Sequence, residues 1–154
     1  MFDKTTNRAV IICRSVEETH KLTAQILKQL FGGEIIGLSG ELGAGKTEFV
    51  RGAAMVIGAQ DDVSSPSYTL QNIYKRSNVD IKQSSECEIN TIYHWDLYRA
   101  GIDLNELLEG KHDAKSVTFI EWVEKFPEIE GMLDIKIGVE VVDETTRQFT
   151  IIRM

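Results

Sequence analysis

Eight consecutive residues, Gly40–Thr47, have the types and spacing that could hold a polyphosphate. They match the pattern G-x-x-x-x-G-K-[ST] at every fixed position. Glycines let backbone N–H groups approach phosphate oxygens closely. In such a loop Lys46 supplies a positive charge to the β- and γ-phosphates, and the Thr47 hydroxyl supplies one oxygen ligand to Mg²⁺. The pattern therefore predicts a phosphate-binding loop for a nucleotide with magnesium.

Magnesium in such a loop also needs a carboxylate, usually at the end of a buried strand nearby. Two apolar segments end in an acid, one at Glu121 and one at Asp96. Spacing alone does not decide between them, so we expect at least one to serve the metal. His94 could be a base or a phosphate contact, although a structural role is more common for such a histidine. We interpret Trp122, which follows Glu121, as a packing residue.

A hydroxyl-rich loop surrounds Pro66 and contains Ser65, Ser67 and Thr69. Loops of this kind can sense a γ-phosphate, as switch segments do. A plain polar turn is the simpler interpretation of the same residues. For the nucleotide, the chain lacks the N-K-x-D string that reads guanine in GTPases, which favours ATP.

Hydrophobic patterns predict the elements that position these residues. Ser15 and Glu18 form a capping box at the start of a helix, whose apolar face extends from Val16 to Phe31 and which ends at Gly32-Gly33. A second helix is expected from Lys46 to about residue 57. Apolar segments predict strands over residues 9–13, 34–39, 68–74, 89–96, 117–121, 135–142 and 148–152.

Helices and strands alternate early in the chain and strands dominate later. This order predicts an α/β fold: a single P-loop NTPase-like domain over residues 1–154, with a mainly parallel central sheet, flanking helices and antiparallel edge strands. The length is that of one ordinary domain.

Charge and cysteine content exclude several classes of protein. The net charge is −7 and the chain has no long run of Lys or Arg, so autonomous nucleic-acid binding is not expected. Cys13 and Cys87 are far apart and fit neither a zinc site nor a disulfide framework. We expect Cys13 in the core and Cys87 as an exposed thiol. No apolar run is long enough to span a bilayer, so the expected location is the cytoplasm.

Four strings considered together resemble the TsaE (YjeE) family, the small P-loop ATPases of bacterial tRNA threonylcarbamoyladenosine biosynthesis. The strings are Gly40–Gly52, Ser65–Leu70, His94–Arg99 and Ile120–Trp122, and their order and spacing fit the family across nearly the whole chain. The P-loop is widely shared, whereas the string His94–Arg99 combined with Glu121-Trp122 is far more specific.

The resemblance implies a role for individual residues. The ATP phosphates would be held by Glu41, Leu42, Gly43, Ala44, Gly45, Lys46 and Thr47. Thr47 and Glu121 would ligate Mg²⁺, and Asp96 would support hydrolysis at the metal shell or by positioning water. Ser65–Thr69 would act as a switch-like loop. Arg147 would lie beside the nucleotide and Val16 close to the base.

The resemblance also implies partners. The family's role is to power or reset the TsaD–TsaB complex, which transfers a threonylcarbamoyl group to adenosine 37 of tRNAs reading ANN codons. An acidic accessory ATPase, weak alone, would leave tRNA contact to these partners. Three features depart from the family pattern: Ser67 replaces the usual Thr, residues 75–88 form a long excursion, and Leu107-Leu108 replaces an aromatic-rich stretch after Arg99.

Two other functions fit the same loop. A small-molecule kinase is compatible with the length, but the chain has no Arg-rich lid segment, and Arg99 and Arg147 are isolated in the sequence. A binding module without meaningful turnover is the other, in which ATP merely orders the loop at Ser64–Thr69. Phosphate release that responds to the partners would separate the ATPase from both.

Overall fold

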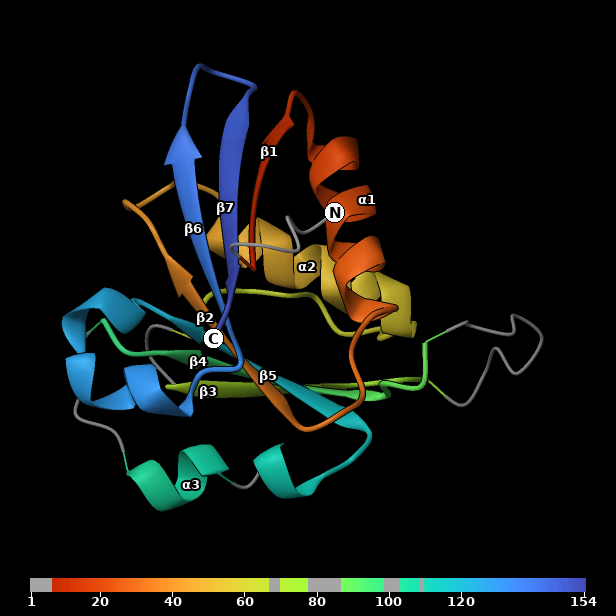
Figure 1. Ribbon diagram of the computed structural model, residues 1–154. Coiled ribbons are helices and arrows are strands. Elements are labelled where there is room, and N and C mark those ends of the chain that lie inside the picture. The colour runs from red at the N-terminus through yellow and green to blue at the C-terminus, as the bar shows by residue number, and fades with distance from the viewer. Residues whose placement is uncertain (1–6, 67–69, 78–86, 99–102, 109) are drawn as a thin grey trace.

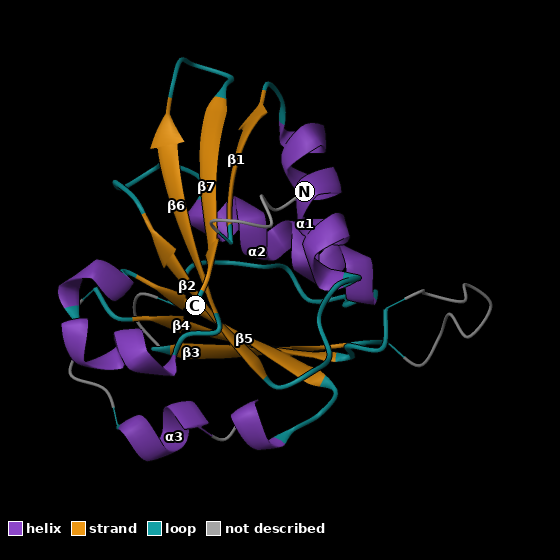
Figure 2. Ribbon diagram, in the orientation of Figure 1, coloured by secondary structure: helices purple, strands orange, loops and turns teal. Residues whose placement is uncertain are grey.

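The computed structural model describes residues 7–66, 70–77, 87–98, 103–108 and 110–154. In this part of the chain, seven strands form one mixed sheet in the order β1-β7-β6-β2-β5-β4-β3 (Figures 1 and 2). The strands are β1 Arg8–Cys13, β2 Glu34–Ser39, β3 Gln71–Lys75, β4 Thr91–Asp96, β5 Ser116–Glu121, β6 Ile135–Val141 and β7 Arg147–Arg153. The α-helices are α1 Val16–Leu27, α2 Lys46–Ile57 and α3 Leu104–Leu108. Short 3₁₀ helices are η1 Gly110–His112, η2 Val123–Lys125 and η3 Pro127–Met132.

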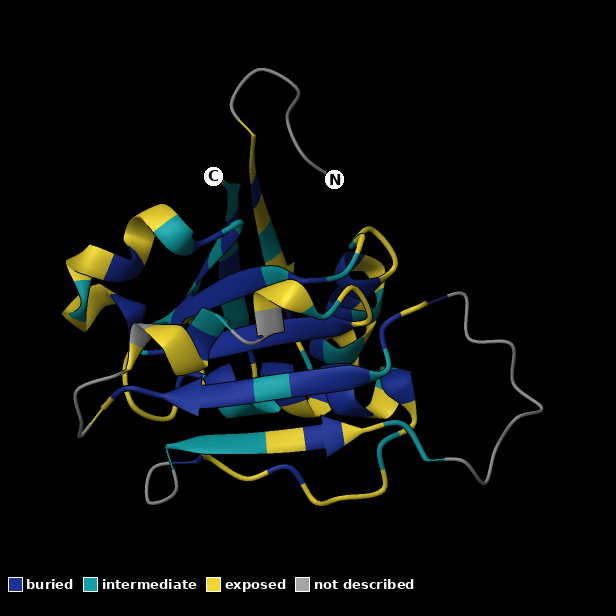
Figure 3. Cartoon of the chain, turned by 90° about the horizontal axis from the view of Figure 1, so that it is seen from below, coloured by how far each residue is buried: buried dark blue, intermediate teal, exposed yellow. Residues whose placement is uncertain are grey.

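The centre of the sheet is parallel and its edges are antiparallel. Strand β2 pairs in parallel with β5 and β6, and β4 pairs in parallel with β5. Strand β7 is antiparallel to β6 and β1, and β3 is antiparallel to β4. Figure 3 shows how burial differs between the edge strand β3 and its inner neighbour β4. Strand β4 is buried along nearly its whole length, whereas β3 is largely exposed or intermediate. The predicted α/β fold with antiparallel edge strands is confirmed.

The sheet is covered on both faces. Helices α1 and α2 lie together on one face, and α3 lies on the opposite side (Figure 1). On the first face, Phe49 of α2 packs against Phe119 of β5 and Phe149 of β7, with ring centroids 6.1 and 5.7 Å apart. A second cluster on the other face includes Ile35, Trp95, Leu107, Ile120, Ile129 and Leu133. This packing fixes α2 over the middle of the sheet.

Helix α1 begins as predicted and ends earlier. The Ser15 hydroxyl accepts a hydrogen bond from the Glu18 N–H at 3.2 Å, and the Glu18 carboxylate accepts one from the Arg14 N–H at 2.7 Å. The helix stops at Leu27 rather than at Gly32-Gly33, so Phe31 lies outside it and is 88% exposed. Val16 is also exposed, so the predicted apolar face was too long.

The glycines after α1 are needed for the turn into β2. Gly32 has a φ of +100°, in the left-handed region that favours glycine. A Cβ atom at Gly32 would lie 1.8 Å from the Ala114 carbonyl oxygen. The two glycines therefore form the turn that leads into β2, and they do not cap the end of α1.

The prediction that Cys87 is exposed was wrong. Both cysteines are buried, and the Cys87 thiol donates to the Leu27 carbonyl oxygen at 3.8 Å. The Arg76 guanidinium also donates to the Cys87 and Ile89 carbonyl oxygens, which holds this segment against the core.

Among the described residues, no helix has the length and hydropathy needed to cross a bilayer.

Candidate functional site

The Gly-rich turn connects β2 directly to α2, as predicted. Gly40 has a φ of +144°, and a Cβ atom there would lie 2.4 Å from the Val139 carbonyl oxygen on β6. Gly45 caps α2 in the left-handed conformation and has no side chain to bond the first turn. The N–H groups of that turn are thus available to an anion at the positive end of the helix dipole.

Lys46 is the first residue of α2, and only 4% of its surface is exposed. Its ammonium donates to the Gly40 carbonyl oxygen at 2.5 Å and to the Glu41 carbonyl oxygen at 3.0 Å. Burial lowers the pKa of Lys46, while the nearby carboxylates of Glu121, Glu124 and Asp96 oppose that shift. The site thus combines a desolvated cation with several acids.

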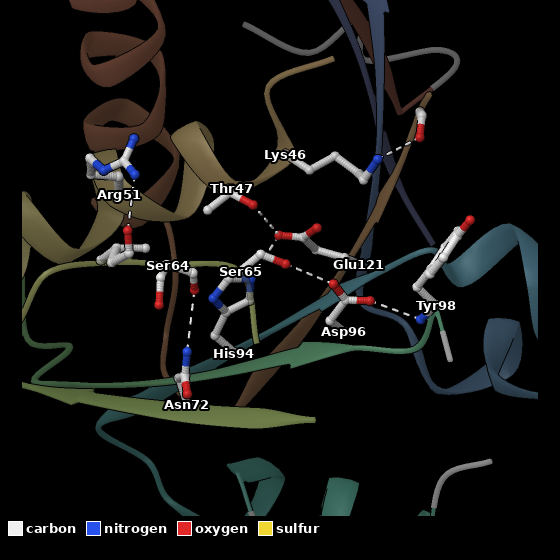
Figure 4. Close-up of polar contacts among 12 residues, drawn as sticks. Lys46, Thr47, Arg51, Ser64, Ser65, Asn72, His94, Asp96, Tyr98 and Glu121 are labelled. Atoms are coloured by element: carbon white, nitrogen blue, oxygen red, sulfur yellow. Dashed lines mark hydrogen bonds and ion pairs between the residues drawn. The ribbon is translucent and has the colours of Figure 1, made fainter. Parts of the chain in front are cut away.

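Glu121 at the end of β5 lies beside the start of α2. Its Oε1 accepts a hydrogen bond from the Thr47 hydroxyl at 2.9 Å and lies 2.8 Å from the His94 Nε2 (Figure 4). His94 is 0% exposed, and its Nδ1 has no hydrogen-bond partner among the described residues. We assign the Nε2–H tautomer, because Nε2 then donates to the carboxylate. This position agrees with the structural role expected for His94.

Asp96 ends β4 and is paired in register with Glu121. Its carboxylate accepts hydrogen bonds from the Ser65 hydroxyl and from the Tyr98 N–H, each at 2.8 Å (Figure 4). The two acids that the sequence left as alternatives therefore lie side by side, with different partners.

The loop that carries Ser65 is anchored through its backbone. The Ser64 carbonyl oxygen accepts from the Asn72 amide at 3.2 Å and from the Tyr74 hydroxyl at 3.1 Å. The Arg51 guanidinium of α2 donates to the Val63 carbonyl oxygen at 2.9 Å. Of the predicted switch-like residues, Ser65 is thus joined to Asp96, whereas Ser67 and Thr69 lie outside the described residues.

These side chains open onto one cavity of about 890 Å³, a volume typical of small-molecule sites. Its lining comprises Arg14, Ser15, Val16, Glu17, Thr19, Leu42, Gly43, Gly45, Lys46, Thr47, Glu48, Ser65, Asp96, Tyr98, Glu121, Trp122, Glu144, Thr145, Arg147 and Phe149. Glu41 and Ala44 do not line it. Their carbonyl oxygens instead accept hydrogen bonds from Lys46 and from the Arg147 Nε, the latter at 2.8 Å.

Several lining residues were missed by the sequence analysis. Arg14 lies in the connection between β1 and α1, and Thr19 lies near the start of α1. Glu144 and Thr145 come from the turn between β6 and β7. Backbone and side-chain donors of Thr145 and Thr146 lower the pKa of Asp143 and hold this turn. No local signal marks these residues, because they meet only when β1 pairs with β7. Tyr98 and Trp122 could have been found, since each closely follows a strand-end acid.

The donor set at the loop suits magnesium. Among the described residues, no group of three or more His, Cys, Asp or Glu side chains is placed to hold a metal ion. The Thr47 hydroxyl and the Glu121 carboxylate are instead a pair of oxygen donors next to a phosphate-binding turn. Mg²⁺ usually takes one or two protein oxygens and completes its octahedron with water and phosphate.

Comparisons with known proteins agree on one family. The family model for "Threonylcarbamoyl adenosine biosynthesis protein TsaE" matches residues 13–149. A tRNA threonylcarbamoyladenosine biosynthesis protein TsaE from Aquifex aeolicus is 33% identical over 146 residues, covering 93% of this chain and 95% of that protein. The protein of the same name from Haemophilus influenzae is 36% identical over 130 residues, covering 80% and 75%.

A solved structure shows the same fold. The crystal structure of YdiB from Bacillus subtilis superposes with a TM-score of 0.70, covering 97% of this chain and 87% of that one. The two sequences are 23% identical, so this likeness concerns the fold alone.

Proposed function

The chain belongs to the TsaE family of threonylcarbamoyl adenosine biosynthesis proteins, and from this premise we propose that it binds and hydrolyses ATP with Mg²⁺ as an accessory protein of that tRNA modification. The family gives a P-loop ATPase fold and a pathway. Our proposal adds the use of Mg²⁺, the hydrolysis of ATP and the identity of the partner proteins.

One observation carries the proposal: the 2.9 Å hydrogen bond between the Thr47 hydroxyl and the Glu121 carboxylate. It joins the last residue of the phosphate loop to an acid on the neighbouring strand, next to the Lys46 ammonium. A helix N-terminus, a buried cation and a hydroxyl–carboxylate pair are the parts that phosphoryl transfer from a nucleotide requires. When bound, Mg²⁺ would neutralise charge on the β- and γ-phosphates.

Each residue then has a defined task. Residues Glu41–Thr47 wrap the phosphates, with Lys46 as the central cation, and Thr47 and Glu121 hold the metal. Asp96 orients the attacking water or the metal shell, and Ser65 orients Asp96 through their hydrogen bond. Ser65, Ser67 and Thr69 together form the switch-like loop.

The nucleoside end of ATP would lie toward the start of α1. Val16 and Arg147 line that part of the cavity, and the Arg147 guanidinium is fixed by the carbonyl oxygens of Ala44 and Asp143, at 2.8 and 2.9 Å. Val16 offers an exposed apolar surface to the base, and Arg147 a cation beside the sugar and phosphates.

The proposed partners are TsaD and TsaB, with which the protein acts in threonylcarbamoylation of adenosine 37 in tRNAs that read ANN codons. A net charge of −7 supports an indirect relation to tRNA, because direct binding depends on basic residues. The proposed location is the cytoplasm. Hydrolysis by the free protein is expected to be slow, and the complex would accelerate it.

The deciding experiment measures phosphate release from MgATP with and without a purified TsaD–TsaB pair and tRNA. A low basal rate that rises with the partners, together with repeated rounds of tRNA modification, is expected. Lys46→Ala should abolish both. A rate indifferent to the partners would leave the ATP site intact and overturn the pathway role, and a screen for a phosphoryl acceptor would then be the next step.

A further inference from the structure

The buried ammonium of Lys46 lies against an aromatic ring. The Lys46 Nζ is 3.8 Å from the centroid of the Trp122 ring, within the range of a cation–π contact. The same ammonium donates to the carbonyl oxygens of Gly40 and Glu41. Two carbonyl oxygens and one ring face therefore surround the cation on which the phosphate loop depends.

An unusual backbone conformation places this ring. Trp122 follows Glu121 at the end of β5 and has a φ of +66°, in the left-handed region that bulky residues rarely adopt. Its N–H donates to the Leu38 carbonyl oxygen and its carbonyl oxygen accepts from the Lys125 N–H, each at 3.0 Å. These bonds hold the sharp turn. One strand end thus presents the carboxylate of Glu121 and, one residue later, the ring of Trp122.

The Trp122 ring also contacts a second aromatic ring. The ring centroids of Tyr98 and Trp122 are 5.0 Å apart, and the Lys125 ammonium lies 4.0 Å from the Tyr98 centroid and 5.0 Å from the Trp122 centroid. The Tyr98 N–H is itself bonded to the Asp96 carboxylate. Trp122 thus contacts both the P-loop lysine and an aromatic side chain that follows the other acid.

Packing alone does not explain the choice of residue here. An ammonium removed from water is costly unless its charge is compensated, and a ring face offers negative potential without competing for the metal as a carboxylate would. The ring also restricts a side chain that otherwise has four rotatable carbon–carbon bonds, which reduces the ordering required when phosphate binds.

We propose that Trp122 is a positioning residue that holds the Lys46 ammonium at the mouth of the phosphate loop through a cation–π contact, and so strengthens MgATP binding. The inference rests on the proposed ATP site. It assigns to Trp122 a role beyond packing and base contact.

The first test observes Lys46 directly by NMR, without nucleotide. The side-chain Hε and Cε resonances, identified by their loss in Lys46→Met, should be shifted upfield by the ring in the wild type. In Trp122→Leu this upfield shift should disappear, because the ring that causes it is gone. Trp95→Phe is the matched control: that ring lies in the cluster on the opposite face of the sheet, so its replacement should leave the upfield shift of the Lys46 resonances unchanged.

The second test varies the ring's electrons and nearly preserves its shape. Mono-, di- and trifluorotryptophan are inserted at residue 122, and the Kd for MgATP is measured by calorimetry. Each fluorine withdraws electron density from the ring face, so the Kd should rise stepwise, by about three- to tenfold over the series. Trp122→Leu should raise the Kd by about five- to thirtyfold, and Trp122→Phe should restore part of the affinity. Thermal unfolding verifies that each variant is folded.

The outcomes separate the two proposals. A wild type that binds no MgATP overturns the proposed function. A wild type that binds MgATP with a Kd indifferent to fluorination overturns the positioning role, as does an upfield shift of the Lys46 resonances that persists in Trp122→Leu.

Discussion

Glu121 and Asp96 are alike in the sequence and different in the structure. Each ends an apolar strand, each is buried, and the two are paired in register across β5 and β4. Glu121 accepts from the Thr47 hydroxyl and contacts His94, whereas Asp96 accepts from the Ser65 hydroxyl and the Tyr98 N–H. One acid is thus tied to the phosphate loop and the other to a surface loop.

The order of the strands explains this difference. Strand β5 is the immediate neighbour of β2, with Leu38 opposite Glu121, so Glu121 lies next to the turn that leaves β2. Strand β4 lies one position farther from the phosphate loop, where the segment before β3 reaches Asp96 instead. The two carboxylates therefore have different partners because the strands that carry them are one position apart in the sheet.

The largest effect is expected for Glu121→Gln. The change removes a charged oxygen donor beside Thr47, so kcat/KM for MgATP should fall by at least about a hundredfold. Phosphate release measured over a range of Mg²⁺ concentrations should show that the variant needs a higher Mg²⁺ concentration for half-maximal activity. Glu128→Gln, an exposed acid in η3, is the control and should behave as wild type. Wild-type magnesium dependence in Glu121→Gln would contradict the metal assignment.

Asp96→Asn should lower single-turnover hydrolysis by about tenfold to a hundredfold, because a carboxylate that orients water is replaced by an amide. The magnesium concentration for half-maximal activity should stay close to that of the wild type. A shift as large as in Glu121→Gln would instead make both acids metal ligands and remove the distinction between them.

The partners of the two acids should differ in their effect on stability. His94→Leu leaves the buried Glu121 without one donor, so the free energy of unfolding should fall by about 2 kcal/mol, measured by urea denaturation. His94→Gln can still donate and should lose less. Ser65→Ala removes the hydroxyl that donates to Asp96. It should lower the free energy of unfolding by less than about 1 kcal/mol, because Asp96 still accepts a hydrogen bond from the Tyr98 N–H. Equal losses would show that the two sites are equally built into the core.

The smallest effect is expected for Ser65→Ala on activity. Loss of one hydrogen bond to Asp96 should reduce single-turnover hydrolysis by about three- to tenfold, with the magnesium dependence unchanged. Ser65→Thr keeps the hydroxyl and should retain most of the rate. A loss in Ser65→Ala equal to that of Asp96→Asn would mean that Asp96 acts only when Ser65 holds it.

Much of the fold could be predicted because its signals are local. The boundaries of α2, Lys46–Ile57, agree with the sequence prediction, since the Gly-rich turn and Gly58 mark both ends. The strands predicted over residues 135–142 and 148–152 also agree with β6 and β7 within one residue at each end. The end of α1 was misplaced by several residues, because apolar residues beyond Leu27 continue the helical spacing after the helix has stopped.

The sequence by itself determined the chemistry of the phosphate loop, because Gly40–Thr47 is contiguous and its backbone conformation depends on its own residues. Only the tertiary structure decided which acid meets Thr47, which ring covers Lys46 and which turn brings Arg147 to Ala44. Those contacts join residues far apart in the chain. They depend on strand order and register, which follow from burying both faces of the sheet at once.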